Sequence, residues 1–156
     1  MSIERAREHL KKYGVADRIQ EFDVSSATVE LAAQALGCEG ARIAKSLSFV
    51  VDGAPILVIA AGDAKVDNAK FKAQFHAKAK MPHGDEVEQL IGHGIGGVCP
   101  FGVNENVRVY LDISMKRFAV MYPACGSSSS AIGLTLEELE KCSECEGWVD
   151  VCKGWE

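Results

Sequence analysis

Apolar and polar residues follow one another along the chain with spacings that change from helical to extended. Residues 2–13 place apolar side chains at helical spacing among charged ones, which predicts an amphipathic helix. A short strand is predicted at 19–24. The alanine- and leucine-rich segment 28–36 predicts a second helix, with Ser25 or Ser26 as its N-cap.

The most apolar part of the chain lies near its centre. Residues 41–51 predict a helical turn that leads into a strand, and residues 54–62 predict a second strand. Asp52 and Gly53 between them form a typical turn dipeptide. The pattern therefore predicts a central hairpin that is apolar enough to be covered on both faces.

The second half of the chain mixes short helices with further strands. Helices are predicted at 67–75, 85–92 and 135–142, and strands at 107–113, 117–124, 131–134 and 148–152. Thr135 and Glu138 form a capping-box pattern at the start of the last helix. Six or seven strands with interspersed helices and no long linker predict a single domain over residues 1–156. Its fold class is α/β with a mixed (α+β) sheet, rather than a regular βαβ array.

Composition narrows the class of protein. The hydrophobic fraction of 47% and charged fraction of 25% are ordinary for a soluble domain. No apolar run approaches the ~18 residues of a membrane span, and the charged N-terminus does not resemble a signal peptide. We therefore expect a cytoplasmic protein with no membrane association.

The net charge of −5 argues against general nucleic-acid affinity. Residues 65–80 nevertheless carry five lysines and one acid. This basic stretch is either a contact surface or a solvated helix face.

Six cysteines invite a metal or disulfide interpretation. Without a signal peptide, reduced thiols are expected. Cys142 and Cys145 have CxxC spacing and Cys152 could be a third ligand, but a structural zinc site needs four ligands and no second pair follows. We predict no metal, and a turn with incidental cysteines.

The segment GHGIGGVCPFG, residues 92–102, is rich in glycine. Gly92, Gly94 and Gly97 match GxGxxG, but a predicted helix precedes them and Pro100 follows, so the strand and helix of a dinucleotide site are missing. The remaining interpretations are a backbone loop that approaches a polar ligand and a tight turn between helix and strand.

This loop, with AKSLSF (44–49) and AAGDAKVD (60–67), resembles the YbaK family of aminoacyl-tRNA deacylases, which are related to the editing domain inserted in bacterial prolyl-tRNA synthetase. The resemblance extends from about Phe22 to Val151. It implies a YbaK-like domain with a central, mainly antiparallel mixed sheet or partly open barrel surrounded by short helices. It also implies a trans-editing hydrolase that removes a small non-cognate amino acid from tRNA-Pro by water attack on the ester, without a cofactor.

The resemblance assigns the catalytic role to Lys45 and to the backbone of Gly96 and Gly97. Lys45 is expected to position the tRNA 3′ end and stabilise developing charge, with a lysine of lowered pKa acting as base left open. Cys99 lies in the same loop, so a thiol nucleophile assisted by His93 is a further alternative. The residues expected to bind substrate are Phe22, Ser46, Gly62, Asp63, Val98, Cys99, Pro100, Gly126, Ser127 and Ser128.

Some of these residues have structural alternatives. Asp63 either orients the site or caps the helix near residue 67, and the serine loop at 126–129 either lines the pocket or is a mobile connection. Relatives that accept cysteine carry an aspartate where Ala131 aligns, and alanine-specific relatives use a histidine that has no counterpart in residues 94–156. The edited amino acid therefore stays open.

The expected partners are the 3′ end and acceptor stem of aminoacyl-tRNA, with a synthetase as a further partner, bound by a monomer. A non-catalytic module of the same fold that binds aminoacyl-tRNA or a synthetase is the alternative function.

Overall fold

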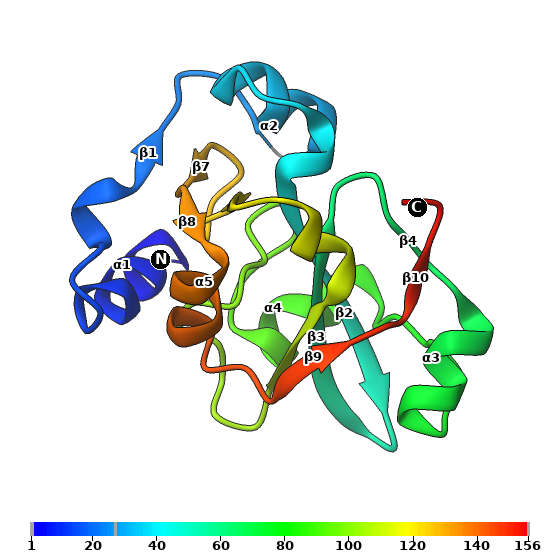
Figure 1. The fold of residues 1–156 in the computed structure, drawn as a ribbon. Helices are drawn as coiled ribbons and strands as arrows, with labels where there is room; N and C mark the ends of the chain where they lie inside the picture. Colours follow the sequence, from blue (N-terminus) through cyan, green and yellow to red (C-terminus); the bar gives the residue numbers. More distant parts are fainter. Residues whose placement is uncertain (1, 27, 156) are drawn as a thin grey trace.

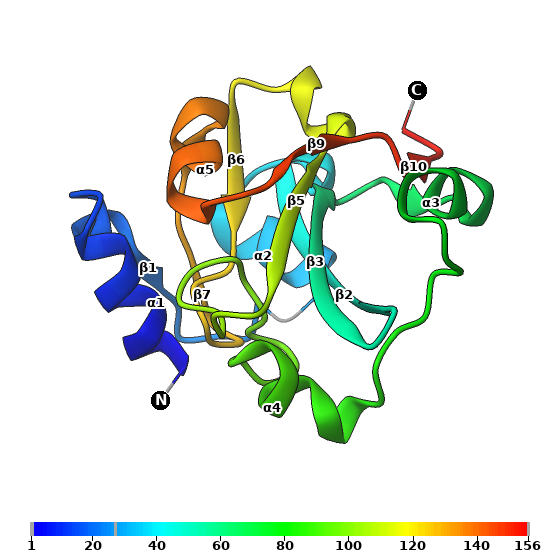
Figure 2. The ribbon, with the colours of Figure 1, turned by 90° about the horizontal axis from the view of Figure 1, so that it is seen from below.

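A mixed sheet of six strands organises the fold, in the order β8-β6-β2-β3-β5-β9 (Figure 1). The computed structural model describes residues 2–26 and 28–155. The sheet strands are β2 (Ile43–Val51), β3 (Ala54–Ala61), β5 (Arg108–Asp112), β6 (Val120–Pro123), β8 (Leu134–Thr135) and β9 (Gly147–Val149). The sheet curls into a half-barrel (Figure 2), which confirms the predicted mixed sheet or partly open barrel. β2 pairs antiparallel with β3, and β6 with β8, whereas β2–β6, β3–β5 and β5–β9 are parallel.

The central hairpin forms as the sequence predicts. β2 and β3 pair from Ala44 opposite Ala61 to Val51 opposite Ala54. Asp52 and Gly53 both have positive φ, 51° and 78°, as a two-residue hairpin turn requires. Every residue of β3 after Ala54 is buried, because the sheet is covered on both faces at this strand.

In the described part of the chain, five short α-helices surround the sheet (Figure 2). They are α1 (Ser2–Lys11), α2 (Val29–Leu36), α3 (Asn68–Phe75), α4 (Val87–Ile91) and α5 (Leu136–Ser143). In Figure 2, α1 and α5 lie at one side of the sheet and α3 at the opposite side. Within residues 2–26 and 28–155, the helices are too short or too polar for any of them to cross a membrane.

The helix starts show which capping predictions were right. Thr135 and Glu138 form the predicted capping box at α5. The predicted cap of α2 was wrong: Thr28 caps this helix by accepting a hydrogen bond from the Leu31 amide at 3.1 Å. Ser25 and Ser26 instead direct their hydroxyls to the carbonyl of Ser128, because the chain before Thr28 is held against the serine loop.

The end of the chain differs from the predicted single strand. After β9, the short strand β10 (Cys152–Lys153) pairs with β4 (Lys65–Val66), outside the main sheet. The change of direction is fixed by the buried Asp112, whose carboxylate accepts hydrogen bonds from the amides of Ser114 and Val151, both at 2.9 Å. A further pair, β1 (Gln20–Glu21) with β7 (Ser130–Ala131), joins the serine loop to the N-terminal segment.

Candidate functional site

A cavity of about 390 Å³ lies between α2, β2 and the segments 81–87, 95–98 and 122–131. Alternation along β2 directs Ala44, Ser46 and Ser48 to one face of the strand, and all three line the cavity. The other apolar lining residues are mainly small aliphatics: Val29, Ala32, Ile43, Val87, Ile95, Val98, Ala124 and Ala131. Such a site suits a small ligand with few polar groups.

A larger hollow, about 740 Å³, lies beside α1 and contains Pro100. Its walls carry several charged side chains, and no other predicted site residue contributes to it. The smaller cavity contains Lys45, Ser46, Gly96 and Val98 together. We therefore take the smaller cavity as the candidate site.

Lys45 is the one charged residue among the described residues that line this cavity. It comes from β2 near the start of the hairpin, and its ammonium donates to the carbonyls of Gly62, at 3.4 Å, and Ala64. Burial lowers the pKa of Lys45, while the nearby carboxylates of Asp63 and Glu30 act in the opposite direction. An ammonium has three donors, so two carbonyl contacts leave one for a ligand.

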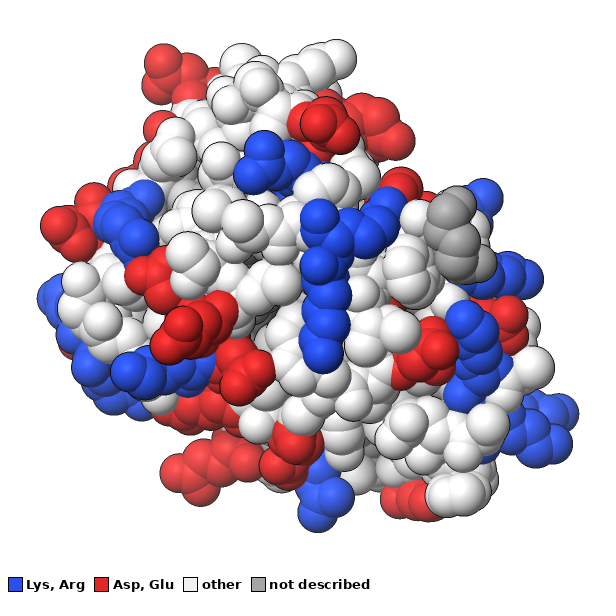
Figure 3. All heavy atoms as spheres, in the orientation of Figure 1, with Lys and Arg blue, Asp and Glu red and all other residues white. Residues whose placement is uncertain are grey.

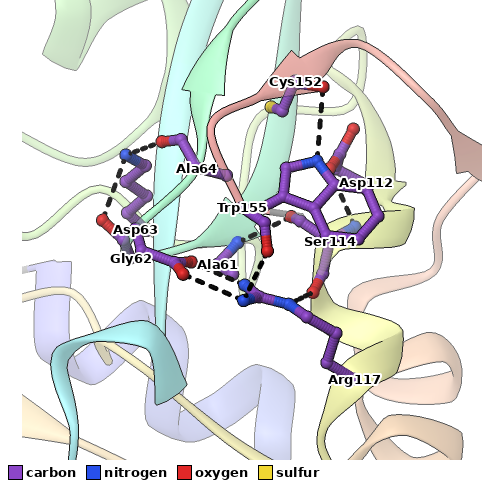
Figure 4. Close-up of polar contacts among 10 residues, drawn as sticks. Ala61, Gly62, Asp63, Ala64, Asp112, Ser114, Arg117, Cys152 and Trp155 are labelled. Carbon is purple, nitrogen blue, oxygen red and sulfur yellow. Dashed lines mark hydrogen bonds and ion pairs between the residues drawn. The ribbon is translucent and has the colours of Figure 1, made fainter.

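The two aspartates near the 62–64 turn have separate roles. Asp67 caps α3 by accepting from the amides of Ala69 and Lys70, at 2.9 and 3.1 Å. Asp63 instead pairs with Arg117, at 2.9 and 2.5 Å (Figure 4), and this guanidinium lowers the pKa of the Asp63 carboxyl. Of the two sequence alternatives for Asp63, the helix cap is therefore wrong.

The glycine loop reaches the cavity through Gly96, which has a φ of 90°. Gly97 follows at a point of close backbone approach. A Cβ on Gly97 would lie 2.6 Å from the carbonyl carbon and oxygen of Gly126 and 2.7 Å from the amide of Ser127. The Gly97 amide donates to the carbonyl of Gly94 at 3.0 Å, so Gly97 supports the loop by packing rather than by offering a free donor.

The serine loop is held by hydrogen bonds to the N-terminal segment. The amides of Ser26 and Phe22 donate to the carbonyls of Ser128 and Ser129, at 2.6 and 2.8 Å. Ser127 and Ser130 share a hydroxyl–hydroxyl bond of 2.8 Å. Ser130, directly after the loop, lines the cavity, whereas the predicted residues Gly126, Ser127 and Ser128 do not. Phe22 lies beside the loop rather than in the cavity wall.

Cys99 does not have the surroundings of a nucleophile. Its side chain is fully buried, and burial raises its pKa to about 12. His93 lies 3.5 Å from the sulfur through Nε2, but the same nitrogen is 2.6 Å from the carbonyl of Phe101. Nε2 must carry the proton to make that bond, so it cannot also accept the thiol proton.

We therefore expect Cys99 to resist alkylation in the folded protein. Iodoacetamide at pH 7.5 should label partly exposed Cys38 and Cys145 and leave Cys99 unlabelled until urea is added. A pKa of about 12 in place of 9.0 lowers the thiolate fraction by about 1,000-fold. Peptide mass spectrometry gives the site-by-site extent. Rapid labelling of Cys99 in the native protein would contradict this assignment.

The cavity also contains residues that the sequence patterns did not indicate. Met81 and Ile95 line its wall and yet are 60% and 72% exposed. Tyr122 enters from the end of β6 and Val29 from α2. Arg117, the partner of Asp63, was also not indicated by the sequence patterns; it lies outside this cavity, at the end of the short helix η4 (Ile113–Arg117). These residues come from a helix, a strand and separate loops, so only the fold brings them together.

Among the described residues, Cys142 and Cys145 belong to no metal site, and the face in Figure 3 carries mixed charge. Figure 3 shows Lys and Arg side chains near the centre of one face, interleaved with Asp and Glu rather than forming a continuous basic surface. Cys142 and Cys145 are free thiols. Within the described part of the chain, no three His, Cys, Asp or Glu side chains are arranged to hold a metal ion.

Comparisons with known proteins agree with this arrangement. A family model described as the aminoacyl-tRNA editing domain matches residues 23–142. The uncharacterized protein YwhH of Bacillus subtilis (strain 168) is 50% identical over 157 residues, covering 100% of both chains. The proline–tRNA ligase of Leuconostoc citreum (strain KM20) is 28% identical over 99 residues, which are 62% of this chain and only 17% of the ligase.

A solved structure points in the same direction. A candidate trans-editing enzyme for prolyl tRNA synthetase has a TM-score of 0.88 at 28% identity, with 98% of both chains covered. The family match spans β2, the glycine loop and the serine loop, and therefore every predicted site residue except Phe22, which lies just before it. The chain belongs to the aminoacyl-tRNA editing domain family and has a YbaK-like fold related to the prolyl-tRNA synthetase editing proteins.

Proposed function

We propose that the protein is a trans-editing hydrolase that removes a small non-cognate amino acid from mischarged tRNA, with tRNA-Pro as the leading substrate. The observation that carries this proposal is the small, largely aliphatic cavity that has Lys45 among its lining residues. Synthetases discriminate poorly between small side chains, because one methylene is worth only about 1–3 kcal/mol. A second hydrolytic site of small volume corrects that error.

In the proposed reaction, a water oxygen attacks the ester carbonyl and the bond between that carbon and the terminal ribose oxygen breaks. The products are the free amino acid and tRNA with its hydroxyl restored. No Asp, Glu, His or Cys lines the cavity among its described residues. We therefore assign the proton transfer to the neighbouring ribose hydroxyl of the tRNA, and the electrostatic role to Lys45. The third N–H of Lys45 is the donor that would meet the substrate's phosphate or ester oxygen.

Ser46 gives the cavity a polar contact point. Its hydroxyl oxygen is buried and has no hydrogen-bond partner among the described residues, although the residue lines the cavity. A buried hydroxyl without a partner costs about 1–3 kcal/mol. Such a group is well suited to bind a polar atom of the aminoacyl ester.

Replacing Ser46 with alanine should therefore raise stability and lower activity together. We expect the free energy of unfolding in urea to increase by about 1 kcal/mol and deacylation to fall about fivefold, as for one lost neutral hydrogen bond. Ser143→Ala is the matched control, because this buried hydroxyl already donates to the carbonyl of Glu140 at 3.3 Å and its loss should destabilise. If Ser46→Ala destabilises as Ser143→Ala does, the hydroxyl has a structural partner in solution.

The decisive experiment is deacylation of a panel of tRNA-Pro carrying alanine, cysteine or serine, measured against spontaneous ester hydrolysis. The proposal requires rapid release from at least one member. No release from any member, nor from the same amino acids on other tRNAs, would favour a non-catalytic module that binds aminoacyl-tRNA or a synthetase. The basic stretch 65–80 is proposed to contact the acceptor-stem backbone without reading its sequence.

A further inference from the structure

We infer that Arg117 is a positioning residue for Lys45, which it fixes through Asp63 and the turn at residues 62–64. The effect on turnover rests on the proposed function. The effect on the Lys45 ammonium does not, and it can be measured in the protein alone.

Each of the three guanidinium nitrogens of Arg117 donates a hydrogen bond. Two of its nitrogens donate to the two oxygens of Asp63, at 2.9 and 2.5 Å. Nη1 also donates to the carbonyl of Trp155 at 3.0 Å, and Nε donates to the carbonyl of Ser114 at 2.8 Å (Figure 4). A bidentate pair whose Nη1 and Nε also donate to backbone carbonyls leaves the guanidinium a single orientation.

Asp63 lies between the two groups that hold Lys45. The ammonium of Lys45 donates to the carbonyls of Gly62 and Ala64, the residues on either side of Asp63. The Asp63 side chain points away from these carbonyls toward Arg117 (Figure 4). Fixing this carboxylate therefore fixes the direction in which both carbonyls face.

The same short helix holds the turn at a second point. The Ser114 hydroxyl accepts from the amide of Ala61 at 3.1 Å, just before the turn begins. Ser114 is itself fixed by Asp112, which accepts from its amide at 2.9 Å. Helix η4 thus binds the chain on both sides of Gly62, so the turn cannot shift without breaking one of these contacts.

The C-terminal segment completes the support. Strand β10 pairs with β4 directly after the turn, and the Trp155 ring nitrogen donates to the carbonyl of Cys152 at 3.3 Å. This leaves the Trp155 carbonyl in place to accept from Arg117. The segment lies beyond residue 142, where the family match ends.

An isolated surface ion pair contributes little, but a bidentate pair within a network can fix geometry. The Arg117 and Asp63 side chains are 27% and 37% exposed. A matched pair exists elsewhere: Arg18 and Glu138 meet at 2.6 Å with exposures of 42% and 35%, and neither lines the cavity. Arg18→Gln therefore removes a similar ion pair without reaching Lys45.

The first test compares Arg117→Gln and Arg18→Gln with the wild-type protein. On the substrate found in the panel, Arg117→Gln should lower kcat/KM by about tenfold or more, because small displacements of catalytic groups reduce rates strongly. Arg18→Gln should leave kcat/KM unchanged, and Arg117→Lys should fall between the two. Asp63→Asn, which keeps its volume, should match Arg117→Gln, and the double variant should lose no more than either single change.

The second test uses the ¹H–¹⁵N signal of the Lys45 ammonium, assigned by its disappearance in Lys45→Ala. Hydrogen bonds to two carbonyls should slow proton exchange enough to show this signal in the wild-type protein and in Arg18→Gln, and Arg117→Gln should lose it. An unchanged signal in Arg117→Gln overturns the inference, whatever the activity. Should no tRNA be deacylated, the signal still decides this inference, while the proposed function fails separately. If Arg117→Gln does not fold, Asp63→Asn provides the same comparison.

Discussion

Lys45→Ala is expected to lower deacylation by about 100-fold or more while the protein stays folded. Lys45 is the one charged residue among the described residues that line the cavity. Loss of a single preorganised group that stabilises developing charge commonly lowers kcat by about 100- to 1,000-fold. The Lys45 ammonium is half-buried against two carbonyls. The variant therefore removes a poorly solvated charge, and the protein should stay folded. Steady-state kinetics with circular dichroism give rate and fold together.

Two controls separate charge from shape. Lys45→Met keeps the length of the side chain and should be nearly as inactive as alanine, because the charge is missing. Lys11→Ala removes an exposed lysine of α1 that pairs only with Glu8 in the described structure, at 2.8 Å, and should retain full activity. Substantial turnover in Lys45→Met would show that the methylene chain, rather than the ammonium, is what the site uses.

The secondary structure was largely predictable because local signals agreed with the fold. Asp52 and Gly53 sit where a two-residue turn needs positive φ, and the apolar run on each side is buried as a hairpin. The prediction of the α2 N-cap failed because three residues with capping side chains lie close together in the sequence. Which of them caps the helix depends on a contact with a residue more than 100 positions away. The Ser26 hydroxyl donates to the carbonyl of Ser128, and Thr28 caps the helix instead.

The candidate site was predictable only in part. Lys45, Ser46, Gly96 and Val98 do line one cavity, as the family resemblance led us to expect. Cys99 belongs to the same loop, but its side chain turns into the core. Loop membership predicts where a backbone runs, whereas the direction of each side chain depends on packing.

Residues joined across the fold left no sequence signal at all. Asp63 and Arg117 are 54 positions apart, and nothing in the spacing of either predicts the other. The same holds for Met81 and Ile95, which reach the cavity from separate loops. A polar network of this kind follows from the topology, because β4, β10 and η4 converge on the turn after β3.

The second large effect is expected from Gly97→Ala, which should reduce both stability and turnover. An added Cβ would lie 2.6 Å from the carbonyl of Gly126, which is backbone and cannot rotate away. The glycine loop and the serine loop would have to separate. Overpacking of this kind costs about 1–3 kcal/mol, and Gly96, the next residue, would move at the cavity wall. Because a displacement of about 1 Å can lower a rate about 100-fold, we expect a loss of that order in kcat/KM.

Gly94→Ala is the matched control within the same loop. A Cβ there would meet only the Glu88 carboxylate, at 3.3 Å, which is the mobile end of a flexible side chain. We expect Gly94→Ala to keep its Tm within a few degrees of the wild-type value and to retain most of its activity. If Gly97→Ala lowers Tm but leaves kcat/KM unchanged, the contact between the two loops is structural only, and the Gly96–Pro100 backbone is not part of the hydrolytic machinery. If both fall together and Gly94→Ala does not, the close approach of these two backbones is what holds Gly96 at the cavity opposite the β2 strand that carries Lys45.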